Sequence, residues 1–144
     1  KNESQIHMLS YSERLKRKGH SQDTVESIIK VIIHEFVHTC HAQYKKYKAT
    51  PTWIDEALAT VLSHQYDNEN LRLGCTLEDF LNGRVDYLTY YTLGRYLFEN
   101  HEKDDILKLA SNRDLVIQMA PDIFQNAKEW VPKKYDNLPL KNND

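Results

Sequence analysis

Two histidines and a glutamate in the first third of the chain have the residue types and the spacing of a metal site. His34 and His38 enclose Glu35 in the pattern HExxH. Residues four apart on an α-helix lie one turn above each other, about 6 Å along the axis, so both imidazoles can bind one zinc ion at about 2 Å. Glu35 is expected beside that ion, where its carboxylate can take a proton from a metal-bound water. Chance alone produces the pattern in roughly a few per cent of chains of this composition.

A catalytic zinc has three protein ligands and keeps a fourth position open for water. The extended pattern HExxHxxGxxH requires glycine at position 41 and histidine at position 44, but the chain has His41 and Tyr44 there, which excludes that class. His41 lies about 10 Å along the helix from His34, too far for one ion to hold both together with His38. We interpret His41 as a polar residue at the edge of a cleft. An alternative source of the third ligand is a carboxylate in the next segment, WIDEALA over residues 53–59, which composition and spacing allow without requiring it.

The order of the two motifs, HExxH and then Trp-x-x-Glu-(small)-x-Ala, resembles the gluzincin metallopeptidases. This group contains thermolysin and the aminopeptidase N family, and the likeness is greatest to their small single-domain relatives. In these families the glutamate of the second motif is the third zinc ligand. The resemblance, which covers most of the chain from Glu26 to Trp130, therefore implies Glu56 as the third ligand and Zn²⁺ as the cofactor.

The resemblance also implies a tyrosine that stabilises the oxyanion of the reaction. Tyr87 precedes the pair Tyr96-Leu97 by nine residues, a separation similar to that in the aminopeptidases, where the leading tyrosine has this role. Tyr87 is also expected near the start of a helix, where a side chain can project into a cleft. Tyr90 is the reserve candidate.

Two departures from the family pattern affect the expected activity. Ala57 stands where gluzincins commonly have glycine, and both residues allow close helix packing. The Gly-x-Met-Glu-Asn motif with which the aminopeptidases grip a substrate amino terminus is absent, and the usual sheet is mostly missing. We therefore expect an endopeptidase rather than an aminopeptidase.

Three further polar residues have both a functional and a structural interpretation. Asp55 points about 100° away from Glu56 on a helix, so we expect a cap or an exposed carboxylate rather than a ligand. Thr60, one turn after Glu56, is placed to accept the second ring N–H of a metal-bound histidine, and packing through its methyl group is the alternative. His64 is expected on the surface.

The motifs predict a zinc-dependent peptide hydrolase of gluzincin type, in which a metal-activated water attacks a carbonyl of a peptide or protein substrate. A zinc hydrolase with another substrate stays open, because the motif determines the water chemistry and not the bond that is cleaved. The alternative from a different class is a latent or degenerate metallopeptidase-like module that binds zinc and serves regulation or interaction. The presence of all the proposed catalytic groups argues against degeneration.

The HExxH motif lies in a helix predicted over residues 23–47, which a capping-box-like pair of Asp23 and Glu26 begins. Apolar residues recur along it at the i, i+3, i+4, i+7 spacing of a face that packs in a core. These residues are Val25, Ile28, Ile29, Ile32, Ile33, Phe36, Val37 and Cys40. We expect this face to be buried.

The fold class is expected to be mainly α with some α+β character, a zincin-like helical domain with a short N-terminal strand or a reduced sheet. The strand is predicted over residues 4–12, where apolar residues alternate loosely. Further helices are predicted from Pro51 or Trp53, behind a threonine cap, to about Gln65, from the Thr76 cap to Gly83, over 86–100, from Asp104 or Asp105, and from Pro121 through Trp130. The helix over 86–100 is apolar on nearly every side and should cross the interior.

Length and composition fit a single domain over residues 1–144, with about 133–144 as a frayed tail. The net charge is −2 and no window reaches 18 apolar residues, which indicates a soluble protein without a membrane span. Lysine and arginine form no long stripe, so no nucleic-acid partner is expected. Cys40 and Cys75 are expected as free thiols. A cytoplasmic location is favoured, secretion stays open if a signal segment has been removed before Lys1, and no oligomeric state is indicated.

Overall fold

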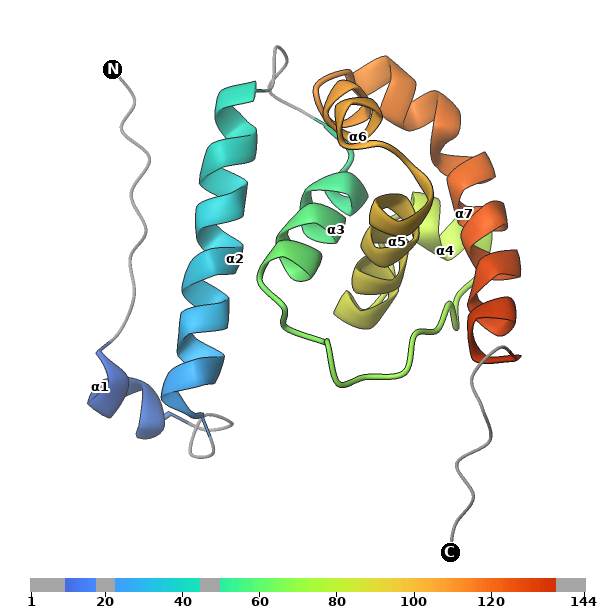
Figure 1. The fold of residues 1–144 in the computed structure, drawn as a ribbon. Coiled ribbons are helices and arrows are strands. Elements are labelled where there is room, and N and C mark those ends of the chain that lie inside the picture. Colours follow the sequence, from blue (N-terminus) through green and yellow to red (C-terminus); the bar gives the residue numbers. More distant parts are fainter. Residues whose placement is uncertain (1–9, 18–22, 45–49, 137–144) are drawn as a thin grey trace, which may run out of the picture.

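The structure is a computed structural model that describes residues 10–17, 23–44 and 50–136. These residues form seven α-helices and no strand, so the predicted mainly α class is confirmed. In chain order the helices are α1 (Tyr11–Leu15), α2 (Val25–Tyr44), α3 (Thr52–Leu62), α4 (Leu77–Leu81), α5 (Tyr87–Asn100), α6 (Lys103–Ala110) and α7 (Arg113–Asp136) (Figure 1). None of the described helices combines the length and the apolar character that crossing a bilayer requires.

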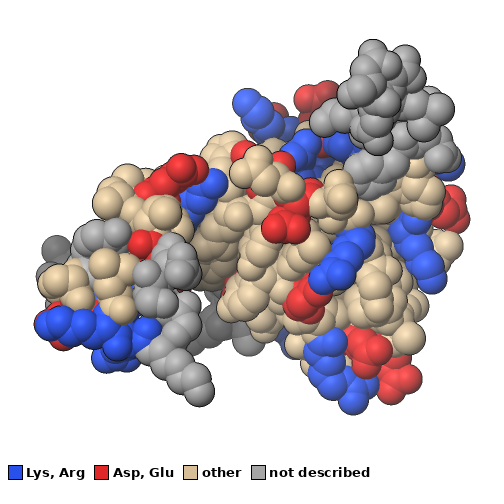
Figure 2. Space-filling view, turned by 90° about the horizontal axis from the view of Figure 1, so that it is seen from below, with Lys and Arg blue, Asp and Glu red and all other residues tan. Residues whose placement is uncertain are grey.

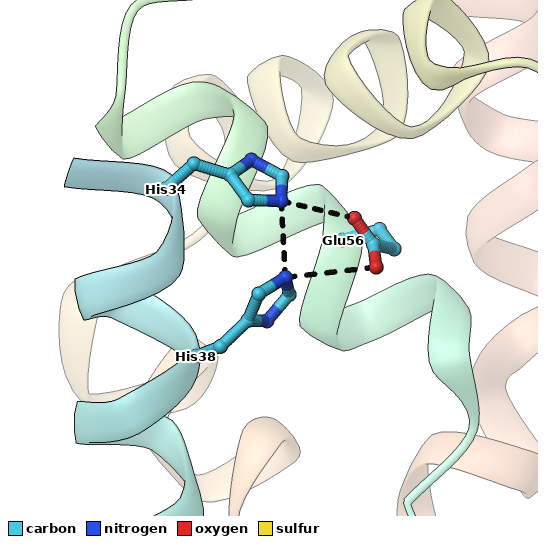
Figure 3. Close-up of side chains that lie close together, drawn as sticks. All are labelled: His34, His38 and Glu56. Atoms are coloured by element: carbon cyan, nitrogen blue, oxygen red, sulfur yellow. Dashed lines mark hydrogen bonds and ion pairs between the residues drawn. The ribbon is translucent and has the colours of Figure 1, made fainter. Parts of the chain in front are cut away.

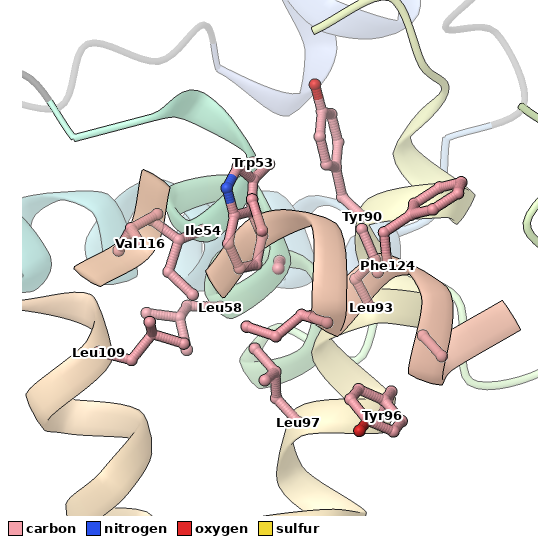
Figure 4. Close-up of a cluster of buried hydrophobic side chains, with 14 of the residues drawn as sticks. Trp53, Ile54, Leu58, Tyr90, Leu93, Tyr96, Leu97, Leu109, Val116 and Phe124 are labelled. Atoms are coloured by element: carbon pink, nitrogen blue, oxygen red, sulfur yellow. The ribbon is translucent and has the colours of Figure 1, made fainter. Parts of the chain in front are cut away.

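The hydrophobic core lies around α3 and α5, which pack against each other in the centre of the molecule. α7 curves round this pair and contacts α4, α5 and α6 (Figure 1). Figure 4 shows the buried side chains that meet there, among them Ile54 and Leu58 of α3, Leu93 and Leu97 of α5, Leu109 of α6 and Phe124 of α7. The prediction that the helix over 86–100 crosses the interior is confirmed, because α5 is buried along most of its length.

α3 and α5 approach each other closely at Gly94. A Cβ atom on Gly94 would lie 2.4 Å from the carbonyl oxygen of Ala57 and 2.5 Å from Cγ2 of Val61. Only glycine therefore fits at this crossing, and the fully buried Ala57 lies directly on it. Because Ala57 follows Glu56 in the chain, the crossing also fixes the position of that carboxylate.

Caps and a turn define the connections around α4 and α5 as predicted. Thr76 Oγ1 accepts the backbone N–H three residues further on at 3.1 Å and so begins α4. Gly83 has a φ of +68°, the left-handed conformation that glycine adopts without strain. Asp86 caps α5 in the same way as Thr76 caps α4, at 2.8 Å, so Tyr87 is the first residue of that helix.

The prediction that the apolar face of α2 is buried is wrong. Val25 is 60% exposed and Phe36 is 58% exposed. The other exposed members of this face are Ile29, Ile32 and Ile33. α2 packs mainly on α3, and it does so with the side that carries His34 and His41, both of which are buried. Periodicity shows that apolar residues share a face, but here polar side chains find partners on α3 and the helix packs by the polar face.

Two predicted starts near the amino terminus also differ. Ser10 Oγ accepts the N–H of Glu13 at 3.3 Å and caps α1, so residues 10–12 are not part of a strand. Residues 4–9 of the predicted strand, like 45–47 of the predicted HExxH helix, lie outside the described residues. α2 begins behind a reciprocal pair of bonds between Thr24 and Ser27, at 3.0 and 3.1 Å, while Asp23 pairs with Arg14 instead of capping.

The predicted ends of α3 and α7 also differ from those in the structure. α3 begins behind Pro51 without a side-chain cap, because Thr50 Oγ1 donates to Asp55 at 3.2 Å, and it ends at Leu62. Pro121 lies inside α7 instead of starting it, at the expense of one backbone hydrogen bond. Residues 133–136 of the predicted frayed tail are helical, and 137–144 lie outside the described residues.

The surface carries charges of both signs side by side. Figure 2 shows lysine and arginine interspersed with aspartate and glutamate on one face. Cys40 and Cys75 are free thiols, as predicted. The mixed surface offers no stripe of one sign on the face shown.

Candidate metal centre

The ends of three side chains meet between α2 and α3. His34 Nε2 lies 3.0 Å from His38 Nε2 and 3.3 Å from Glu56 Oε2, and His38 Nε2 lies 3.6 Å from Glu56 Oε1. Figure 3 shows both imidazoles and the carboxylate pointing into the same space from the two helices. Among the described residues, this ligand group has donor atoms that all lie within 4.8 Å of one another. The structure therefore brings together the three residues predicted as zinc ligands.

The residues of the ligand group fit a zinc ion. Atoms bound at about 2.0–2.1 Å to a tetrahedral zinc lie about 3.3 Å apart, and the observed distances of 3.0, 3.3 and 3.6 Å bracket that value. By themselves the three side chains satisfy one another poorly. Among the described residues Glu56 Oε2 is buried without a hydrogen bond and only faces His34 Nε2 at 3.3 Å, and a buried carboxylate is unfavourable unless a positive charge neutralises it. Two imidazoles and one carboxylate are moreover the donor set of a catalytic zinc rather than of a structural one.

Local sequence explains why α2 and α3 present these groups to each other. A polar stripe runs along α2 at the i, i+3, i+4, i+7 spacing of one helical face. Its polar members are His34, His38 and His41, and the apolar Val37 lies on the same face. On the other helix, the contact of Ala57 with α5 sets the rotation of α3 about its axis, so that the preceding Glu56 points toward α2.

Glu35 lines a cleft of about 670 Å³ beside the ligand group. The cleft lies along α2 and is bounded by α1, by the segment after α3 and by the start of α5, with His34, Lys30, Tyr66 and Tyr87 among its lining residues. Glu35 is exposed there and is not a member of the ligand group. Its carboxylate is therefore positioned to contact a bound molecule rather than a metal.

Tyr87 lies at the mouth of this cleft, where its ring centroid is 6.1 Å from that of His34. Its pKa is raised above the ordinary tyrosine value, first by the negative charge of Glu56, then by burial and then by the charge of Glu35. The phenol therefore keeps its proton at neutral pH and can donate a hydrogen bond. Tyr90, the reserve candidate, is buried and packs its ring 6.1 Å from that of Tyr87. Tyr87 is half exposed and is the better placed of the two to meet a ligand in the cleft.

Tyr66 also lines the cleft, and sequence reasoning missed it. Burial raises its pKa most, followed by the nearby Tyr87, and Glu56 contributes as well. Its ring packs against Tyr91 at 5.8 Å, which holds this part of the segment after α3 against the core. The only signal in the sequence was an aromatic residue at the start of a segment that otherwise looks like a polar surface loop.

The proposed role of Thr60 as an acceptor for a histidine is wrong. Thr60 Oγ1 donates to the carbonyl oxygen of Glu56 at 2.7 Å, and the buried Nδ1 of His34 has no hydrogen-bond partner among the described residues. The hydroxyl turns back because the carbonyl one turn earlier in the helix is within its reach. His64 is exposed and pairs with Asp67 at 2.8 Å, so its prediction as a surface residue is confirmed.

His41 and Asp55 lie where neither was expected. His41 is buried, it lines a groove between α2, α3 and α6 rather than the cleft beside the ligand group, and it is not a member of the ligand group. Asp55 neither caps α3 nor is exposed, because its carboxylate pairs with His41. The two residues form a contact of their own between α2 and α3.

Comparisons of the chain with protein-family models, with curated proteins and with solved structures found no match. The resemblance to gluzincins therefore rests on the two motifs themselves. A functional conclusion has to come from the geometry of the site.

Proposed function

We propose that this chain is a zinc-dependent peptide hydrolase of gluzincin type. The observation that carries the proposal is the convergence of His34 Nε2, His38 Nε2 and the Glu56 carboxylate at distances that suit one tetrahedral ion. A zinc ion held by these residues would polarise a substrate carbonyl and lower the pKa of a bound water toward neutrality. The buried Oε2 of Glu56 supports the same conclusion, because it makes no hydrogen bond among the described residues and faces His34 Nε2 at 3.3 Å, where a bound cation would neutralise it.

Glu35 is the proton carrier in the proposed reaction. It follows His34 in the chain, lies in the cleft and stays outside the ligand group. A carboxylate in this position can accept a proton from the attacking water and then donate it to the leaving amine.

Tyr87 is the proposed donor to the carbonyl oxygen as that oxygen gains negative charge. Its position beside His34 supports this role, since a phenol there can donate a hydrogen bond to a bound carbonyl. A donor aimed at the oxyanion contributes about 3 kcal/mol to stabilisation of the transition state.

An internal segment of a peptide is the proposed substrate. The cleft of about 670 Å³ runs along α2 from the ligand group toward α1, which suits an extended chain. The sequence lacks the motif that grips a free amino terminus in the aminopeptidases. Both observations favour an endopeptidase.

The test compares the wild-type protein with Glu35→Gln, in zinc content and in cleavage of an unfolded protein such as casein. We expect both proteins to bind one zinc per chain and only the wild type to cleave, with activity lower by orders of magnitude in the variant. Near-native activity of Glu35→Gln would overturn the mechanism, and absence of zinc from the wild type would overturn the function. Zinc without cleavage in the wild type would favour the alternative, a latent or degenerate zinc-binding module.

A further inference from the structure

His41 and Asp55 form a second buried contact between α2 and α3, next to the ligand group. His41 is 6% exposed, the same as His34. Its Nδ1 pairs with Asp55 Oδ1, and its Nε2 lies 2.9 Å from the carbonyl oxygen of Ala110 at the end of α6. Because a carbonyl oxygen only accepts hydrogen bonds, Nε2 is the donor in the second contact. The imidazole is thus held from two sides, by α3 and by α6.

This contact lies beside the ligand group on both helices. His41 lies one turn past His38 on α2, and Asp55 directly precedes Glu56 on α3. At 1.5 Å of rise per residue, the two contacts are separated by about 5 Å along α2. We infer that His41 and Asp55 are positioning residues, which hold α2 at the register where its ligand pair meets Glu56. The inference rests on the proposed metal site.

Other contacts are poorly suited to set this register. The apolar face of α2 is exposed, so most of its apolar residues do not fix it against α3. The two Nε2 atoms of the ligand histidines face each other at 3.0 Å, and only one of them can donate to the other. His41 Nδ1 and Asp55 Oδ1 are in ion-pair contact, His41 Nε2 donates to Ala110, and Thr50 Oγ1 donates to Asp55 Oδ2 at 3.2 Å. This pair can therefore hold α2 on α3 before a metal binds.

Preorganisation of this kind acts on metal affinity. Distances from a metal to its ligands tolerate about 0.2 Å, and residues that orient ligands without touching the ion contribute about 10–100-fold to affinity. A looser α2 keeps its two histidines but no longer presents them to Glu56 at the right separation. Loss of the contact should therefore weaken zinc binding although every ligand remains.

The test measures the zinc affinity of the full chain by competition with a chromophoric chelator. Asp55→Asn keeps the size of the side chain and removes its charge, and His41→Gln keeps a donor that can reach Ala110. We expect each variant to bind zinc about 10–100-fold more weakly. The double variant should lose little more than either single one, because both residues act through one contact.

Phe124→Leu is the matched control for a general loss of stability. Phe124 of α7 stacks on Phe80 of α4 at 5.1 Å, so this ring contact involves neither α2 nor a member of the ligand group. This variant should lower the melting temperature and leave the zinc affinity unchanged. If His41 and Asp55 have a positioning role, their variants bind zinc more weakly than a control variant of the same melting temperature. If their role is merely structural, variants of equal melting temperature have equal zinc affinity.

Wild-type zinc affinity in Asp55→Asn and His41→Gln would overturn the inference, as would a loss no greater than that of the control at the same melting temperature. If neither variant folds, Thr50→Val decides, because it removes only one hydrogen bond to Asp55. An affinity weakened several-fold would support the inference, and an unchanged one would overturn it. Failure of the wild type to bind zinc would overturn the proposed function together with the inference. Zinc binding by the wild type with unchanged affinity in the variants would overturn the inference alone, so the two failures can be distinguished.

Discussion

Replacing Gly94 by alanine puts a methyl group into a close contact between α3 and α5. The new Cβ would lie 2.4 Å from the carbonyl oxygen of Ala57 and 2.5 Å from Cγ2 of Val61, whereas ordinary contact begins at 3.4 Å. The side chain of Val61 can rotate, but the backbone oxygen cannot, so α3 has to move away by about 1 Å. Overpacking of this kind costs about 1–3 kcal/mol.

Helix propensity acts in the opposite direction, because alanine is about 1 kcal/mol more favourable than glycine inside a helix. Because the clash is with a backbone oxygen that cannot rotate away, the overpacking cost falls in the upper part of that range, about 2–3 kcal/mol. We therefore expect a net destabilisation of about 1–2 kcal/mol, which lowers the melting temperature by roughly 3–8 °C in a chain of this length. The shift of α3 also moves Glu56, the neighbour of Ala57. Zinc affinity should therefore fall in the same variant.

Thermal and urea unfolding followed by circular dichroism measure the stability change. Gly74→Ala is the matched control, since a Cβ at Gly74 has no atom within 4 Å, and its stability should stay close to that of the wild type. Adding Val61→Ala to Gly94→Ala should not restore wild-type stability, because the contact with the carbonyl oxygen remains. A Gly94→Ala protein as stable as the wild type, or more stable by the amount that helix propensity provides, would refute the reasoning.

Three further predictions concern single side chains. Glu56→Ala should lose zinc on dialysis while staying folded, and full zinc occupancy would place the third ligand elsewhere. Tyr87→Phe should keep zinc affinity and lower kcat about a hundredfold or more, and an unchanged kcat would remove Tyr87 from the mechanism. Burial alone would raise the pKa of Asp86, but hydrogen bonds from Thr89 and the charge of Arg72 outweigh burial and lower it below 3.8. The stability that this lowered pKa provides is therefore complete above about pH 4 and is lost as the pH falls through the folded-state pKa. Asp86→Asn should consequently flatten the dependence of urea unfolding on pH in this acidic range.

The ligand group could be predicted from the sequence because one short-range spacing and one resemblance between motifs identify its members. His34 and His38 share a helical face by their separation alone, and a resemblance supplied Glu56. Helix caps were predictable for the same reason, since Thr76 and Asp86 act on backbone groups three residues away. Features that depend on a few neighbouring residues can be read from the chain.

The packing of α2 could not be read in this way. The apolar residues from Val25 to Phe36 share a face, but the sequence does not show which face another element covers. The face with the histidines packs on the neighbouring helices because its partners come from α3 and α6. The bond between His41 and Ala110 joins residues 69 positions apart. Tyr66 escaped prediction similarly, because only the folded chain brings it to the cleft. Such contacts follow from tertiary structure, which local patterns do not encode.

The ligand group also bears on how α2 comes away from the molecule. Two of its members lie on α2 and the third on α3, and α2 packs mainly on α3. Partial unfolding that lifts α2 off the core therefore separates the ligands at the same moment, so metal release and this local opening are one event. Zinc at a hundred times its Kd would oppose the opening by about 2.7 kcal/mol. Amide hydrogen exchange along α2 should consequently follow the concentration of zinc, while exchange in the interior of α5 follows global unfolding.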